Sequence, residues 1–169
     1  MKRLARTYFE NPTLEVAQDL IGKVILFEGH KGLITETEAY IGHDDPACHA
    51  AMGQTPRNAV MFGPAGFSYV YFIYGMYHCL NVVTEHEGFP AAVLIRGLKL
   101  FEDGVHLNGP GKLCRALQIT RAHNGLDLAA HPAFGIFDEG YKLPFIATPR
   151  IGIRKGQDKP WRFLGKIEG

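Results

Sequence analysis

The chain has 169 residues, a length that fits one ordinary domain better than two. Its composition, 46% hydrophobic and 21% charged with a net charge of +1, is globular and excludes an intrinsically disordered chain. Three widely spaced cysteines, Cys48, Cys79 and Cys114, argue against a disulfide framework and favour a reduced compartment. Because no charged-then-apolar leader follows Met1, we expect no secretion signal.

The charge is unevenly distributed along the chain. Residues 1–103 carry eight basic and twelve acidic side chains, whereas residues 104–169 carry ten basic and five acidic ones. The basic C-terminal third is either an ordinary solvated face or one wall of a phosphate-binding surface, and charge alone leaves both interpretations open.

The first elements are a helix and two strands. Asn11 and Pro12 suit the cap and first turn of a helix, apolar residues follow at helical spacing, and Gly22 ends it. Residues 24–27 and 33–40 are predicted to form strands joined by a turn at 29–32. Residues 42–66, rich in glycine, proline, aspartate and asparagine, are predicted to form a long ordered loop, which is often functional in a compact domain.

The second half of the chain is predicted to be mostly strands. We expect strands at 67–74, 80–84 and 91–98, a helix from about 109 to 117, and short strands at 150–153 and 162–164. Residues 58–84 lack charged side chains over 27 positions, long enough to cross a membrane. Because Pro64, His78 and Asn81 interrupt this run and parts of it alternate with period two, we predict no membrane span.

Glutamates dominate the second predicted strand. Strand periodicity places Glu36, Glu38 and Tyr40 on one face. If that face points outward, the glutamates are simply solvated. If it points inward, burial raises the pKa of a carboxyl group toward that of a useful general base. Nearby His43, Asp44, Asp45 and His49 have no familiar metal-ligand spacing, so we predict no metal site.

Four of the seven tyrosines lie between Phe67 and Tyr77. They indicate either aromatic packing in a core or, for Tyr74 beside Gly75, a wedge between stacked bases. Arg96 lies in an apolar strand and therefore needs an acidic or phosphate partner.

Seven short segments, in order, resemble the alkyladenine (3-methyladenine) DNA glycosylase family, the type found in mammals and many bacteria. The resemblance covers nearly the whole chain, and the segments begin at residues 36, 54, 69, 93, 109, 150 and 159: ETEAY, QTPRN, YVYFIYGMY followed by Asn81, VLIR, GPGKLC, RIGI and KPWRF. It implies an α/β (α+β) fold formed by one compact domain over residues 1–169. That domain would have a curved antiparallel sheet flanked by helices and a protruding hairpin that intercalates into DNA.

The resemblance also implies an activity and the residues that perform it. The activity is removal of damaged purines from duplex DNA by base flipping and hydrolysis of the N-glycosidic bond, without a cofactor and without strand cleavage. Glu38 matches the general base, Arg96 the arginine that helps to hold the water and Glu38, and Ile151 a main-chain carbonyl that holds the water. Further matches are Tyr40, His49, Tyr71 and Asn81 in the base pocket, and Tyr74 and Met76 at the intercalating tip.

Two alternatives belong to other functional classes. One is a catalytically silent nucleic-acid-binding module, which would have lost the base or its partner arginine, whereas Glu38 and Arg96 are both present. The other is a small RNA-binding domain, against which the full set of flipping residues stands. We therefore expect a monomeric enzyme whose partner is damaged double-stranded DNA and not a membrane. It would work in the cytoplasm or nucleoid of a prokaryote or in the nucleus of a eukaryote.

Overall fold

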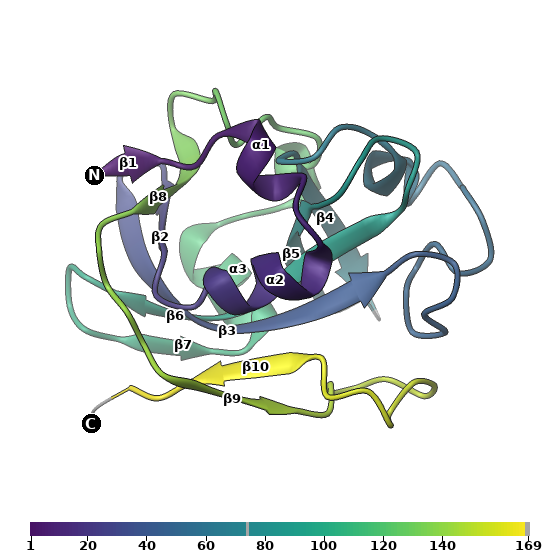
Figure 1. The fold of residues 1–169 in the computed structure, drawn as a ribbon. Coiled ribbons are helices and arrows are strands. Elements are labelled where there is room, and N and C mark those ends of the chain that lie inside the picture. Colours follow the sequence, from purple (N-terminus) through teal and green to yellow (C-terminus); the bar gives the residue numbers. More distant parts are fainter. Residues whose placement is uncertain (74, 168–169) are drawn as a thin grey trace.

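A curved sheet of ten strands organises the chain in the computed structural model, which describes residues 1–73 and 75–167 (Figure 1). Each pairing between described strands is antiparallel. The main path runs through β1 (Lys2–Arg3), β8 (Phe134–Asp138), β2 (Val24–Phe27), β3 (His30–Ile41), β6 (Ala91–Leu100), β5 (Tyr77–Val83) and β4 (Ser68–Ile73). Off this path, β10 (Arg162–Gly165) pairs with β3 and β9 (Phe145–Thr148), and β7 (His106–Asn108) pairs with β6.

Short helices pack against this sheet, which confirms the predicted α+β class. They are α1 (Arg6–Phe9), α2 (Thr13–Asp19) and α3 (Pro110–Leu117), with 3-10 turns η1 (Ala59–Phe62) and η2 (Arg121–His123). Helix α2 packs against β3, and α3 packs against β5 and β6. Helix α3 begins at Pro110, and Gly111 follows it in the first turn. A Cβ atom added to Gly111 would lie 2.7 Å from the ring of Tyr77. Only glycine therefore lets α3 and β5 approach this closely.

Strand β3 is the branch point of the sheet. Its first half pairs with β2, its second half pairs with β10, and its other edge pairs with β6. The β3–β6 register shifts between Ile34 and Thr37, an irregularity that bends a strand. The segment Glu36–Tyr40 consequently lies where the two parts of the sheet meet.

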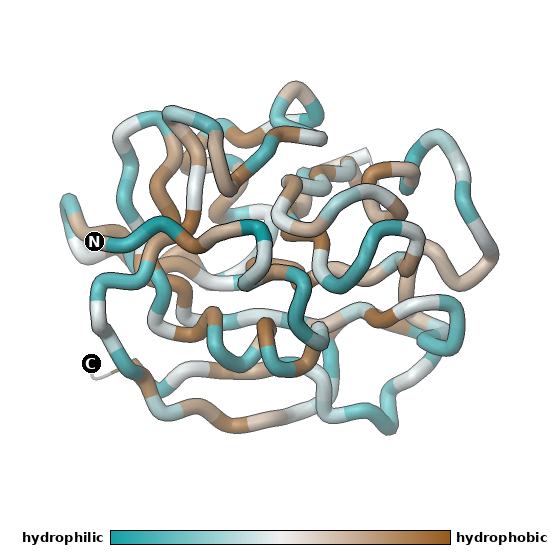
Figure 2. Tube along the Cα trace, turned by 45° about the horizontal axis from the view of Figure 1, so that its top comes forward, coloured by the Kyte–Doolittle hydropathy of each residue, from teal (hydrophilic) through white to brown (hydrophobic). Residues whose placement is uncertain are grey.

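Two apolar clusters fill the interior, and Figure 2 shows the hydrophobic strand segments inside and hydrophilic loops around them. The larger cluster joins α2 and α3 to the sheet, with Phe9, Leu20 and Phe134 fully buried. The smaller contains Tyr69 and Tyr71 of β4. Burial of most of β4 and β5 accounts for the uncharged residues at 68–73 and 77–83. Among the described residues, no helix has the length and apolar character needed to cross a membrane.

Two local predictions were wrong. Pro12 has the extended backbone of a cap position instead of the first helical turn, and the Asn11 side chain donates to the Tyr8 carbonyl instead of capping α2. Residues 150–153 are irregular and not a strand. The Ile151 N–H bonds a side chain instead of a neighbouring strand, and Gly152 has a φ of +73°.

Candidate active site

A cleft of about 430 Å³ opens at the carboxyl end of β3. Its walls are formed by strands β3, β4, β5 and β6, by residues 46–49 of the loop after β3, and by residues 151–155 of the loop before β10. This volume is in the range of about 300–1,000 Å³ that is typical of small-molecule sites. Seven sequence-predicted residues line it together: Glu38, Tyr40, His49, Tyr71, Asn81, Arg96 and Ile151. Their convergence from separate segments makes this cleft the candidate site.

Glu38 is the buried carboxylate of the cleft, so the inward orientation of this strand face is correct. Its side chain has no exposed surface. One carboxylate oxygen accepts a 2.8 Å hydrogen bond from the Tyr40 hydroxyl, and the other accepts a 2.7 Å bond from the Ile151 backbone N–H. The observed contact of Ile151 is thus made by its N–H, whereas the role expected for its carbonyl stays a prediction.

Arg96 is fixed by a second carboxylate, which confirms the acidic partner expected for it. Its Nε lies 3.1 Å from Glu36 Oε2, and its terminal nitrogen lies 3.8 Å from Glu38 Oε1. Glu36 Oε2 also accepts a 2.7 Å bond from Arg162 Nε, on the strand opposite. The result is a four-residue network of alternating charge, in which Glu36 holds the guanidinium of Arg96 near Glu38.

Burial raises the pKa of Glu38 above its ordinary value of 4.5. The positive charge of Arg96, the Ile151 N–H and the Tyr40 hydroxyl oppose this rise, and the negative charge of Glu36 adds to it. The carboxyl group therefore has the raised proton affinity of a general base, while its partners still favour the charged form.

Aromatic rings line the cleft beside Glu38. The rings of His49 and Tyr71 have centroids 4.2 Å apart, and His49 Nδ1 lies 3.1 Å from the Tyr69 hydroxyl. His49 is exposed at the cleft mouth, but the protein around its ring removes much of its solvation. This desolvation, and to a smaller extent the positive charge of Arg57, lowers the pKa of His49 to about 4. The ring is therefore neutral at physiological pH, and a positively charged ligand would meet no charge repulsion from it.

One predicted site residue lies outside the cleft. Met76 does not line the cleft; it is 71% exposed at the tip of the β4–β5 hairpin. Tyr74, the other intercalation candidate, lies outside the described residues. Asn81 lines the cleft from β5, where its side-chain amide donates to the Tyr69 carbonyl. The described residues contain no group of three or more histidine, cysteine or acidic side chains placed to hold a metal ion.

Sequence reasoning missed the residues that support the site. Glu36 stood beside Glu38 in the motif, but nothing showed that it would bind Arg96 and Arg162. Asp45 and Arg150 form an ion pair across 105 positions, with both side chains fully buried. No local pattern identifies such a pair, because only the folded chain brings these segments together.

The sequence profile of the family described as methylpurine-DNA glycosylase matches residues 7–168. The chain belongs to this family. It is a family of DNA glycosylases, hydrolases that act on N-glycosyl bonds and so initiate base excision repair. The resemblance carried by the seven short segments is thereby confirmed at the level of the family.

Similar proteins occur in several bacteria. A protein of Wolbachia sp. subsp. Brugia malayi (strain TRS) is 61% identical over 161 residues, covering 95% of both chains. A Sodalis glossinidius protein is 60% identical with the same coverage, and a Rickettsia felis protein is 58% identical, covering 95% of this chain and 92% of its own. Each carries the name "Putative 3-methyladenine DNA glycosylase".

Proposed function

We propose that this protein excises alkylated and deaminated purines from duplex DNA. The substrate class comprises 3-methyladenine, 7-methylguanine, hypoxanthine and ethenoadenine. Residues 1–169 act as one glycosylase domain. The observation that carries the proposal is the buried Glu38 carboxylate, held by Tyr40 and Ile151 beside the aromatic wall of the cleft. A base inside a duplex cannot reach this carboxylate, so the damaged nucleotide is flipped into the cleft.

Hydrolysis needs one proton acceptor and one leaving group. Glu38 takes a proton from a water molecule whose oxygen forms a bond to C1′ of the flipped nucleotide. The bond from C1′ to the purine nitrogen breaks, and the base departs with the electron pair. A purine methylated at N3 or N7 is cationic and leaves as a neutral base, whereas hypoxanthine and ethenoadenine are neutral in DNA and leave as anions. Arg96, whose terminal nitrogen lies 3.8 Å from Glu38 Oε1, orients Glu38 and the attacking water.

The aromatic wall selects the damaged base. Tyr40, His49 and Tyr71 offer π faces to the flipped purine, and a cationic purine gains about 0.5–2 kcal/mol from a good contact of this kind. The depressed pKa of His49 keeps this ring neutral beside such a cation. Asn81 crowds the exocyclic amine of normal guanine and so excludes undamaged guanine.

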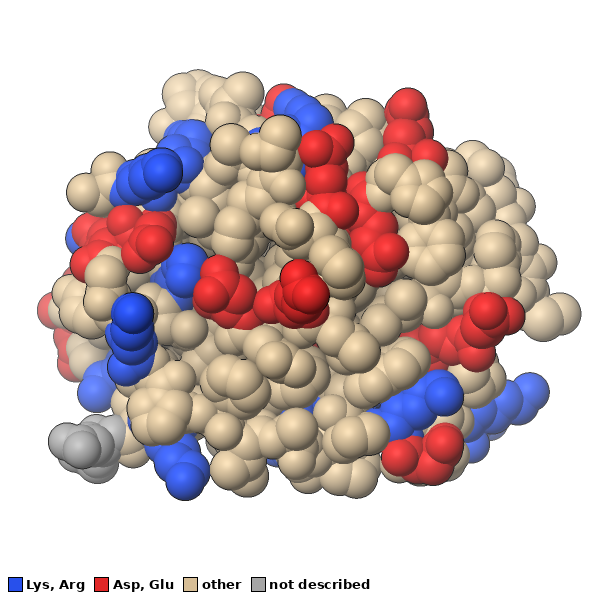
Figure 3. Space-filling model, viewed as in Figure 1, with Lys and Arg blue, Asp and Glu red and all other residues tan. Residues whose placement is uncertain are grey.

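The β4–β5 hairpin and the loop between β9 and β10 contact the DNA. The exposed Met76 approaches the gap left by the flipped nucleotide, and Tyr74, outside the described residues, is proposed to fill it. Figure 3 shows basic side chains over the loop between β9 and β10, where Arg154 and Lys155 are exposed at the cleft rim. These cations suit phosphate groups beside the cleft. We propose a monomeric enzyme that requires no cofactor and acts in the cytoplasm or nucleoid.

Base release from defined duplexes tests the function. Single-turnover reactions would use duplexes that contain one hypoxanthine, one ethenoadenine or one 7-methylguanine, and alkali would convert abasic sites to strand breaks. We expect breaks at the lesion with at least one duplex. Binding without breaks in any of the three would instead favour the catalytically silent binding module.

The rate of base release should fall at acidic pH. Glu38 works only when it is deprotonated, and its pKa is raised above 4.5, so kcat/KM declines as pH drops through a value above 4.5. Because the pKa of His49 is lowered to about 4, His49 adds no step between about pH 5 and 8. A pH–rate profile on a cationic lesion measures this, and a flat profile down to pH 4 would contradict the prediction.

Glu38→Gln should stabilise the fold at neutral pH. The raised pKa means that the charged carboxylate costs stability above the folded-state pKa, and this cost is absent below the unfolded-state value near 4.5. Each pH unit by which the pKa is raised corresponds to about 1.4 kcal/mol. Denaturation at several pH values should therefore show an advantage of the variant at pH 7 that shrinks as pH falls. A constant or growing difference on acidification would refute this explanation.

A further inference from the structure

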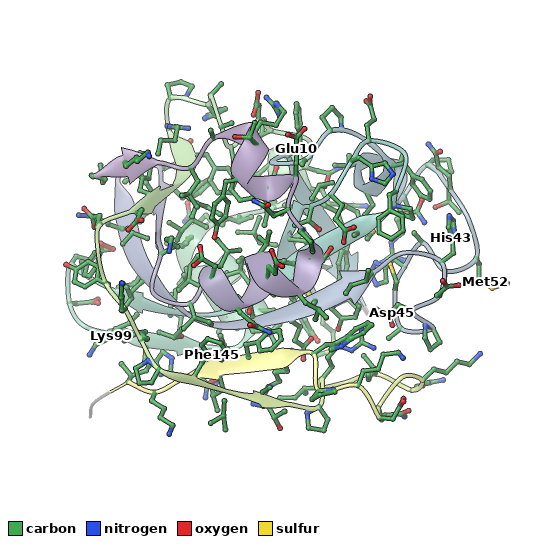
Figure 4. The ribbon with its side chains drawn as sticks, in the orientation of Figure 1. Glu10, His43, Asp45, Met52, Lys99 and Phe145 are labelled. Atoms are coloured by element: carbon green, nitrogen blue, oxygen red, sulfur yellow. The ribbon has the colours of Figure 1, made fainter. Side chains whose placement is uncertain are left out.

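The buried ion pair of Asp45 and Arg150 adjoins the cleft, because their chain neighbours Pro46 and Ile151 line it, and it joins three of the segments that form the cleft. Arg150 donates to both Asp45 carboxylate oxygens, at 2.7 and 2.9 Å, and neither side chain has exposed surface. Figure 4 shows Asp45 beside the end of β3, where the chain leaves the strand. The pair is thus a two-bond clamp in the protein interior and not a surface contact.

The guanidinium of Arg150 contacts the strand that carries Glu38. It donates a 3.0 Å bond to the carbonyl of Ala39, the residue between Glu38 and Tyr40. Its carbon lies 4.8 Å from the centre of the Tyr40 ring and 5.1 Å from that of Trp161. Arg150 therefore fixes both the backbone beside Glu38 and the plane of the ring whose hydroxyl binds Glu38.

The same pair fixes the two cleft loops. Asp45 accepts backbone N–H bonds from Ile41 and Ala47, so it shapes the turn that leads to His49. Arg150 immediately precedes Ile151, whose N–H holds Glu38 Oε2. Gly156 packs against the guanidinium of Arg150. A Cβ atom added to Gly156 would lie 2.7 Å from a terminal nitrogen of Arg150, and the φ of Gly156 is +77°.

Stability alone gives a weak reason for such a pair. A buried ion pair gives little or no net stabilisation compared with well-packed apolar side chains. Arg150 Nε is also one of two buried side-chain atoms without a hydrogen-bond partner among the described residues, an added cost. A costly, rigid element that adjoins both hydrogen-bond donors of one carboxylate, Tyr40 and Ile151, is expected where a small displacement of catalytic groups lowers the rate.

We propose that Asp45 and Arg150 are positioning residues of the active site, which hold Ile151 and Tyr40 in register with the Glu38 carboxylate. This inference rests on the proposed role of Glu38. It assigns the pair no contact with substrate, and its effect reaches the reaction only through Glu38 and the rings of the cleft.

The test compares Asp45→Asn, Arg150→Lys and Gly156→Ala with wild type and Glu38→Gln. Single-turnover base release would be measured at saturating enzyme, where the rate constant does not depend on the fraction of protein that is folded. We expect rate constants about 10- to 100-fold lower for Asp45→Asn and Arg150→Lys, and a smaller loss for Gly156→Ala. Asp127→Asn, which removes the partner of Arg6 in an ion pair outside the cleft lining, is the matched control and should keep the wild-type rate constant.

The pH profile separates positioning from a purely structural role. Glu38 is faced by Arg96, Glu36, the Tyr40 hydroxyl, Cys79 and the Ile151 N–H. Because the Ile151 and Tyr40 bonds lower the pKa of Glu38, their displacement should move the acidic limb of the rate profile to higher pH. The Asp127→Asn profile should not move.

Three results would overturn the inference. They are wild-type rate constants and profiles despite lower melting temperatures, equal losses in Asp127→Asn, and loss of the folded state in all three cleft variants. The last would make the pair a requirement of the fold itself. A Glu38→Gln variant with the wild-type rate would instead refute the assignment of Glu38 as the base. That result is distinguishable from the three that overturn the positioning role of Asp45 and Arg150.

Discussion

Replacing Glu38 by glutamine should nearly abolish base release and leave DNA binding intact. Glutamine has almost the same shape, its oxygen can accept the Ile151 N–H bond, and its amide can donate to the Tyr40 oxygen. It cannot take a proton from water, and a positioned general base contributes about 10²–10⁴-fold to a rate. We expect a loss of that size in single-turnover base release, with unchanged affinity for the lesion duplex.

Glu36→Gln is the matched control for this substitution. Glu36 lies two residues before Glu38 on β3 and is nearly as buried as Glu38. Its carboxylate contacts Arg96 and Arg162 and does not take the place of the proposed general base. Its loss should weaken the hold on Arg96 and reduce the rate far less. If the two variants lost activity equally, the carboxylate network would matter as a unit and Glu38 could not be assigned as the base.

Arg96→Gln should lower base release at neutral pH and restore part of it at alkaline pH. Arg96 is the first of the groups that keep the pKa of Glu38 down, and an opposite charge within about 4–6 Å moves a carboxyl pKa by about 1–3 units. Without it, burial and the charge of Glu36 leave more of Glu38 protonated. We expect the acidic limb of the pH–rate profile to move up by about 1–3 pH units, so that the rate lost at neutral pH is regained at alkaline pH.

Arg162→Gln supplies the comparison for Arg96. Arg162 binds the same oxygen of Glu36, but no bond or ion pair links it to Glu38 among the contacts of the described residues. Its removal should leave the pH profile close to that of wild type. An Arg96→Gln variant whose loss is the same at every pH would show that Arg96 acts only by orientation and not through the proton affinity of Glu38.

Local patterns in the sequence predicted most of the strand segments and the helix α3. Val24–Phe27 was predicted with its observed bounds, and the observed strands β3 and β6 contain their predicted segments. Turn residues and period-two apolar patterns act over a few residues, so they are readable without the fold. The prediction was wrong where a residue far away in the chain binds the segment. Residues 150–153 carry a strand-like pattern, but their polar groups bind Glu38 and Asp45 instead of a neighbouring strand.

The sequence by itself also determined the family and seven of the residues that line the cleft, because the order and spacing of short motifs can be read without coordinates. Only the tertiary structure decided that Glu38 faces inward, since one strand offers two faces and packing selects between them. It alone joined Glu36 to Arg96 and Arg162, and Asp45 to Arg150. Contacts between segments far apart in the chain depend on the register of the sheet and on how the loops close over it, and no local pattern records them.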